Sequence, residues 1–168
     1  MAVIFNTTVG GASATSYVSV GSADDYMATR TDTSAWDALL DNSTSTLSAT
    51  TKKQYLLIQS TREIDSTFRF FGSRDGDDLK GSTDYQNLEF PRAEDTDQDG
   101  TLIIEQEVQD CTCEQALWLL LRNSPQTAEG DNVVKLPKFS EQAYDYIKSR
   151  VTRAVIKVGK YGWQGSDF

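Results

Sequence analysis

The feature that most constrains the fold is a helical spacing of side chains between about residues 49 and 70. Five of them recur at intervals of three and four positions, with Ile58 widening the stripe: Leu57, Thr61, Ile64, Phe68 and Phe71. This spacing places them on one face of a long amphipathic helix. Gly72 follows at once and predicts the end of that helix.

A second helix is predicted between about residues 104 and 122. Ile104, Val108, Cys111 and Gln115 share one face, and the run Ala116 to Leu121 is almost continuously apolar. Apolar residues on all sides of a helix predict burial against several other elements. Trp118, which lies in this run, is therefore expected in the core. The sequence Asn123-Ser124-Pro125 predicts where the helix stops.

The two cysteines, Cys111 and Cys113, lie within the second helical pattern. Residues two positions apart on a helix point to nearly opposite faces, so these thiols cannot easily bridge each other. The chain contains no histidine, and a zinc site would lack ligands. Structural thiols are the preferred interpretation, and no cofactor is expected.

The N-terminal half contains less regular segments. Residues 1–15 are rich in Gly, Ser, Thr and Ala, which predicts an arm that is flexible or ordered by a partner. Ser22 is a predicted N-cap for a short helix over residues 22–30, with acidic side chains in its first turn. Residues 72–87 form a long polar loop, and loops of that length in compact domains are usually functional or disordered.

The C-terminal segment contains a short helical pattern followed by a strand-like pattern. Residues 141–149 fit a short helix, whereas residues 151–158 are rich in β-branched side chains and fit a strand. A helical protein offers this strand no obvious partner, so it is expected to pair outside its own core. The predicted fold is mainly α: a small helical bundle with a long inserted loop, a flexible N-terminal arm and an extended or β C-terminal arm. We expect a helical core with its N-terminal arm over residues 1–131 and a docking arm over residues 132–168.

Charge divides the chain at the same place. Residues 1–134 carry a net charge of −13, whereas residues 135–168 hold 7 Lys and Arg against 3 Asp and Glu, a net charge of +4. The two parts should therefore seek different partners. The sequence has no apolar run long enough to span a bilayer and does not begin like a signal peptide, which predicts a soluble intracellular product.

A group of aspartates resembles the start of an EF-hand calcium loop. Five residues fit that loop, in which oxygen ligands alternate before a glycine: Asp95, Asp97, Asp99, Gly100 and Leu102. The position of the bidentate Glu is held by Gln106, and Pro91 stands where a helix should enter. These aspartates are weak metal candidates, and a polar turn ending in Asp-Gly is the preferred interpretation.

The composition also limits catalysis. Without histidine, the commonest general base and every Ser-His or Cys-His nucleophile arrangement are absent. A hydrolase that uses only carboxylates stays open, because paired carboxylates can cleave glycosides, but no pair stands out. We expect that the protein is not an enzyme.

Six segments, taken in order, resemble tailed-phage head-to-tail connector adaptor proteins, also called head-completion proteins. Their relatives are also labelled DnaT-like single-stranded-DNA-binding proteins. The resemblance covers roughly residues 16–123 and depends on the order and spacing of these pieces: SYVSVGSADDYM (16–27), WDAL (36–39), LLIQSTREID (56–65), QNLEFPR (86–92), the Asp-Gly turn, and EQEVQDCTCEQALWLLL (105–121). The long loop and the C-terminal region depart from the pattern, which leaves the details of portal contact open.

The resemblance implies a mainly helical virion subunit at the neck of the particle. It would assemble with neighbouring adaptor subunits as a twelve-membered ring beneath the portal protein after DNA packaging. The ring would extend the channel for double-stranded DNA and carry the stopper, the next connector or the tail protein. No membrane contact is implied. Within the resembling motifs, Arg62 is expected to pair with an acid of a neighbouring subunit and Arg92 to anchor the loop after Pro91; solvated surface arginines are the alternative.

The net negative charge suits a channel that DNA must cross without sticking, although it can equally serve solubility alone. The C-terminal segment is interpreted as a docking arm that pairs strands with the portal, and an ordinary edge strand is the alternative. Its candidate partner-binding residues are Arg150, Arg153, Val155, Lys157, Lys160, Tyr161 and Trp163. The competing hypothesis is a module that binds single-stranded nucleic acid through these basic and aromatic side chains, against which the low pI of the chain argues.

Overall fold

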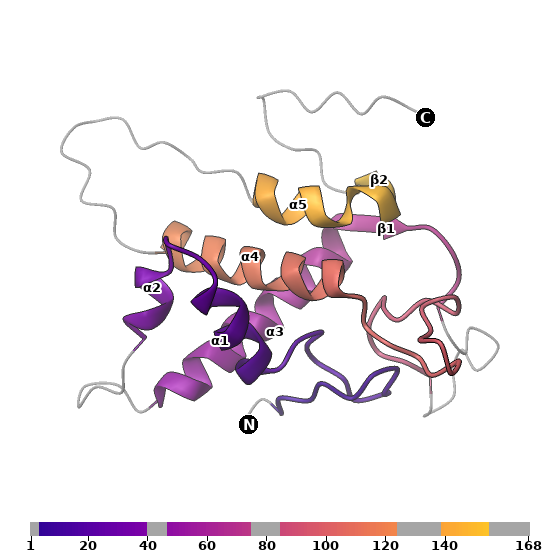
Figure 1. Ribbon diagram of the computed structural model, residues 1–168, viewed down its shortest axis with the longest axis horizontal. Coiled ribbons are helices and arrows are strands. Elements are labelled where there is room, and N and C mark those ends of the chain that lie inside the picture. Colours follow the sequence, from indigo (N-terminus) through magenta and orange to yellow (C-terminus); the bar gives the residue numbers. More distant parts are fainter. Residues whose placement is uncertain (1–3, 40–46, 75–84, 124–138, 155–168) are drawn as a thin grey trace.

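The computed structural model of the chain describes residues 4–39, 47–74, 85–123 and 139–154 (Figure 1). Over these residues the protein is mainly helical, as predicted. The helices are α1 (Val20–Ala28), α2 (Ser34–Asp37), α3 (Ala49–Thr67), α4 (Gln106–Asn123) and α5 (Glu141–Ile147), and the strands are β1 (Phe68–Phe70) and β2 (Val151–Ala154). A 3₁₀ turn, Lys148–Arg150, joins α5 to β2.

Helix α4 lies at the centre and contacts α1, α2, α3 and α5 (Figure 1). Its two cysteines face different parts of the core. Cys111 packs in a cluster with Ile64 and Phe90, whereas Cys113 packs in a second cluster with Trp36 and Leu57. Both thiols are buried and free, which confirms that they do not bridge each other. Burial raises the pKa of the Cys111 thiol well above its usual value.

The first long helix, α3, begins where it was predicted and ends earlier. The hydroxyl of Ser48 caps it by accepting a hydrogen bond from the backbone N–H of Thr51, at 3.1 Å. The predicted helix continued to residue 70, but Phe68 adopts extended backbone geometry and begins β1. Phe68 and Phe70 are both buried and Arg69 between them is exposed, which is the alternation of a strand. Phe68 fits the helical spacing and the strand spacing equally, so the periodicity could not locate the change.

The C-terminal strand pairs inside the chain, contrary to the expectation that it pairs outside its own core. β2 runs antiparallel to β1, with Phe68 opposite Ala154 and Phe70 opposite Val151. The partner strand was missed because its three residues were absorbed into the predicted helix. Residues 155–158 of the predicted strand lie outside the described residues.

Helix α5 belongs to the body, although the predicted docking arm included it. Ala143 and Ile147 are fully buried, and Phe139 and Tyr144 contact the ring of Phe68. α5 also lies along α4 (Figure 1). The described part of residues 132–168 therefore completes the core.

Two details of the N-terminal half also differ from expectation. The N-cap of α1 is Ser19, whose hydroxyl accepts from the backbone N–H of Ser22 at 3.0 Å; Ser22 itself lies inside the helix. Residues 4–17 form a hydrogen-bonded loop, in which the backbone N–H of Thr15 donates to the carbonyl of Asn6 at 2.7 Å. From residue 4 onward the predicted arm therefore has partners within the chain.

Trp118 is half-buried, so its predicted place in the core is wrong. Leu120 is also half-buried and Leu121 is 41% exposed. The last turns of α4 thus present one apolar side to the surface, which a continuous apolar run cannot indicate. The fully buried tryptophan among the described residues is Trp36, whose indole N–H donates to Asp24 at 2.8 Å.

In the described part of the chain, every helix is too short or too polar to cross a membrane.

Candidate functional site

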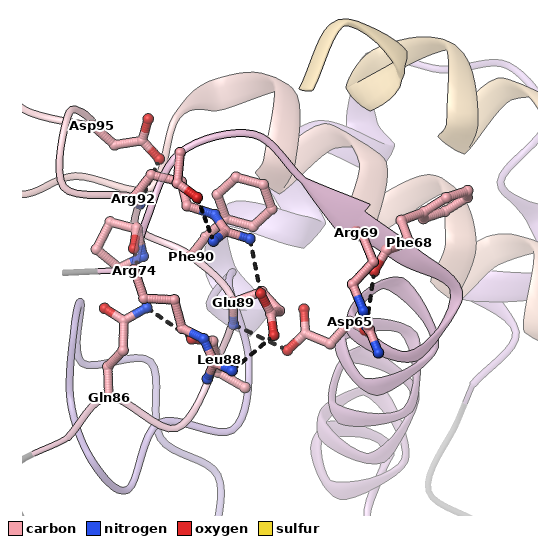
Figure 2. A network of polar contacts seen from close by, with 12 residues as sticks. Asp65, Phe68, Arg69, Arg74, Gln86, Leu88, Glu89, Phe90, Arg92 and Asp95 are labelled. Carbon is pink, nitrogen blue, oxygen red and sulfur yellow. Dashed lines mark hydrogen bonds and ion pairs between the residues drawn. The ribbon is translucent and has the colours of Figure 1, made fainter. Parts of the chain in front are cut away.

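A buried hydrogen-bonded node joins three segments that are distant in the sequence. The hydroxyl of Tyr17 donates to the carboxyl group of Asp65 on α3. The same hydroxyl accepts from the backbone N–H of Glu89 at 3.1 Å and of Phe90 at 3.2 Å. Figure 2 shows Asp65 beside the backbone of Glu89, whose N–H lies 3.3 Å from the second carboxyl oxygen. The node holds the loop before α4 against α3.

Burial shifts the pKa values of both side chains in this node. It raises the pKa of Asp65 to about 7, although the hydrogen bonds from Tyr17 and the Glu89 backbone lower it. Burial, and then the carboxyl group of Asp65, raise the pKa of Tyr17 well above its usual value. The Tyr17 hydroxyl therefore stays protonated and remains a donor at all physiological pH values.

Arg92 contacts the loop around Pro91 through a planar guanidinium. It is only 5% exposed and forms an ion pair with Glu89, at 2.8 Å between Nη2 and Oε2. Its guanidinium also lies over the rings of Phe70 and Phe90. Arg74 approaches the other oxygen of Glu89 at 3.0 Å (Figure 2). One carboxylate thus pairs with two cations from separate parts of the loop between β1 and α4.

Arg150, a predicted partner-binding residue, is held within its own chain. Its Nη1 lies 2.7 Å from a carboxylate oxygen of Asp95, and a second ion pair joins it to Glu105. The side chain of Asp95 is almost fully buried, and its other oxygen accepts from the backbone N–H of Arg92 at 2.9 Å. Arg150 therefore attaches the start of β2 to the loop before α4.

The aspartates of the calcium-like loop have local partners. Asp97 Oδ1 accepts from the backbone N–H of Asp99 at 2.9 Å and of Thr101 at 2.8 Å, which is the geometry of a turn closed by an aspartate side chain. Gly100 adopts a φ of 79°, which favours glycine. Asp95 turns away from Asp97 and Asp99 toward Arg150. Among the described residues there is no group of three or more acidic or cysteine side chains arranged to hold a metal ion.

The other predicted partner-binding residues cannot be placed in a site. Of Arg153, the structure describes the backbone alone, opposite Arg69 in the two-stranded sheet. Val155, Lys157, Lys160, Tyr161 and Trp163 lie outside the described residues. Their assignment as a docking surface stays a prediction.

Sequence analysis missed two buried polar residues on α4. Glu114 forms an ion pair with Arg30 and accepts from the hydroxyl of Tyr26 at 2.6 Å. Gln115 donates to Glu63 at 2.6 Å and accepts from the backbone N–H of Ser140 at 3.0 Å. The two residues link α4 to α1, α3 and the start of α5. A polar pair inside the helical pattern was the available signal, because buried polar groups need partners.

The exposed side of α3 carries a different kind of site. Arg62 is exposed there and stands between two open hollows, one beside the loop at Asn87 and one beside Tyr55. The predicted interface residue Arg62 is therefore available to a partner, whereas the predicted anchor Arg92 is buried.

One family model matches residues 1–158, and its description is "Putative DnaT-like ssDNA binding protein". The chain belongs to this family. The match covers nearly the whole chain and agrees with the label expected for its relatives; it does not name a head-to-tail connector. No curated protein and no solved structure gives a significant match.

Proposed function

We propose that the protein is a structural adaptor subunit of a tailed-phage head-to-tail connector, located in the neck of the virion. The observation that carries the proposal is the node of Tyr17, Asp65 and Glu89. Each of these residues comes from a different segment of the adaptor-like pattern, namely residues 16–27, 56–65 and 86–92. The residues of the adaptor-like pattern thus form contacts that hold the helical body together. A subunit that assembles with other proteins needs such a stable body.

The charge of the chain fits this role. The net charge of −9 disfavours tight contact with phosphate, so a ring of these subunits lets double-stranded DNA pass without holding it. In this proposal a twelve-membered ring binds beneath the portal, extends the DNA channel and carries the next connector or tail protein. The chain performs no catalysis in this account.

The anchored start of β2 supports a docking role for the residues that follow it. Arg150 ties this point to Asp95 and Glu105, so the residues after Ala154 follow an anchored strand. A short anchored attachment lowers the entropy cost of docking. The predicted partner for that segment is the portal, through strand pairing.

The test is addition of the purified protein to DNA-filled heads that carry the portal, with portal-free shells as the control. We expect stable, stoichiometric binding to the portal-bearing heads alone. Equal binding to both particles, or no binding to either, would refute the proposal. Electron microscopy of the heads would show whether the added density forms a ring at the portal.

Single-stranded nucleic-acid binding is the second candidate, because the description of the family names ssDNA binding. The basic and aromatic residues after Ala154 would contact the strand, since cations and stacked rings are the usual means. A low-salt mobility shift with a labelled oligonucleotide tests this candidate. Tight binding that disappears when the chain ends at Ala154, without addition to heads, would favour it over the adaptor.

A further inference from the structure

Two neighbouring open hollows lie along the exposed face of α3. The first hollow, of about 440 Å³, is lined by Arg62, Asp65, Asn87 and Leu88, among others. The second, of about 300 Å³, is lined by Tyr55, Ile58, Gln59 and Arg62. Arg62 is common to both hollows, and we refer to them together as the α3 groove.

Arg62 differs from the other arginines in its lack of a partner. Ion pairs in the described part of the chain engage Arg30, Arg74, Arg92, Arg122 and Arg150. Arg62 has no ion pair or hydrogen bond there, and its neighbours in the groove are partly apolar. Tyr55 is 36% exposed, and Ile58 beneath it is buried. A single cation, Arg62, next to apolar side chains can bind one carboxylate on a protein loop. A nucleic-acid strand is usually bound by several cations in a row.

An exposed acidic turn outside the groove, residues 97–100, offers the complementary charge. Asp97 and Asp99 are exposed, and the Asp97 carboxylate is already used to close the turn. Asp99 has no cationic partner among the described residues. Apart from its two chain neighbours, no residue lies within 4 Å of the position that a Cβ at Gly100 would occupy, so this turn borders open space. In Figure 1 the loop before α4 lies at the right, and its residues Asn87 and Leu88 border the groove, whereas Asp97 and Asp99 do not.

We infer that the α3 groove receives the Asp99 turn of a second copy of this chain, with Arg62 pairing with the Asp99 carboxylate. The two surfaces are different, so the contact is head-to-tail. A head-to-tail contact whose rotation closes produces a ring. The inference rests on the proposed function for the setting in which the ring forms, but the contact itself is a property of the chain.

The test is a charge exchange read by sedimentation velocity at low salt and high protein concentration. Arg62→Glu and Asp99→Arg should each weaken self-association about tenfold or more, and the double variant should recover most of it, because the pair is restored with reversed signs. Asp99→Arg leaves the Asp97 hydrogen bonds intact. Lys148→Glu is the control, since it changes the charge as Arg62→Glu does at an exposed side chain outside the groove. Near-ultraviolet circular dichroism verifies that each variant is folded.

A wild-type chain that shows no self-association, or a double variant as weak as the single variants, would overturn the contact. An oligonucleotide that is bound by the wild-type chain and lost in Arg62→Glu, with self-association unchanged, would assign the groove to nucleic acid and also overturn it. Addition to portal-bearing heads is scored separately. If both single variants still add to heads, the proposed contact is refuted but the adaptor role is not. If the wild-type chain self-associates as proposed but never adds to heads, the adaptor role is refuted but the contact is not.

Discussion

Tyr17 and Asp65, 48 positions apart in the sequence, are joined by a partly buried hydrogen bond. The Tyr17 hydroxyl donates to Asp65 and accepts hydrogen bonds from the backbone N–H groups of Glu89 and Phe90. A single phenol therefore joins the segment before α1, helix α3 and the loop before α4. We therefore expect this polar contact to contribute more to the stability of the body than any exposed ion pair.

Replacement of Tyr17 by Phe tests this dependence. The variant keeps the ring but leaves a partly buried carboxyl oxygen and the buried N–H of Phe90 without a partner, so we expect a loss of about 1–3 kcal/mol in the free energy of unfolding. Urea denaturation measures it. Tyr55→Phe is the matched control because that side chain lies at the surface, and its change should stay within about 0.5 kcal/mol. Equal stability of the two variants would show that the node contributes nothing.

The raised pKa of Asp65 predicts a pH dependence with a defined sign. The folded chain holds a proton on Asp65 up to about pH 7, whereas the unfolded chain releases it near the model value of 3.8. Asp65 therefore contributes stability that is fully present below about pH 4 and is lost as the pH rises to 7. The loss is roughly 4 kcal/mol at 1.36 kcal/mol per pKa unit.

Thermal unfolding between pH 5 and pH 8 measures this contribution. The melting temperature of the wild-type chain should fall across this range, and Asp65→Asn should flatten the dependence because it cannot ionise. A steep fall that persists unchanged in Asp65→Asn would assign the pH dependence to another group.

Glu114 is expected to matter far more than the other acidic partner of Arg30. Glu114 is buried, whereas Asp32 is 58% exposed and binds the same guanidinium. Glu114→Ala leaves Arg30 and Tyr26 without their buried partner and should cost about 3–5 kcal/mol. Asp32→Ala should cost less than about 1 kcal/mol, since exposed ion pairs contribute little. Similar melting temperatures for the two variants would contradict this assignment.

The segments that the sequence could predict are those with long, uninterrupted periodicity. α3 and α4 appear within a few residues of their expected bounds because their core faces repeat over several turns. The exchange from helix to strand at Phe68 was not predictable, since Phe68 and Phe70 become a strand only by pairing with Val151–Ala154.

Among the candidate sites, only roles that depend on residues close together in the sequence could be predicted. Arg92 could be assigned an anchoring role from its planar guanidinium and its place after Pro91 in the resembling motif. The node and the Glu114 ion pair could not be predicted, because each joins residues from separate segments. Trp118 was misplaced because composition does not specify which side of a helix remains uncovered.

Truncation distinguishes the body from the segment that follows it. A chain that ends at Ala154 keeps α5 and β2, so we expect native helical circular dichroism and a melting temperature close to that of the full chain. It should nevertheless fail to add to portal-bearing heads. A chain that ends at Asp131 loses the buried Ala143 and Ile147 and should be strongly destabilised. If the chain ending at Ala154 joined heads normally, the C-terminal segment would be dispensable for docking.

The most direct test of the adaptor role is the number of copies of this chain in purified, DNA-filled virions, measured by quantitative mass spectrometry against the portal protein. The account predicts one copy of the chain for each copy of the portal, present in tailed particles and absent from heads that lack a portal. Virions that contain no copies, with the chain recovered instead on single-stranded DNA from infected cells, would contradict it.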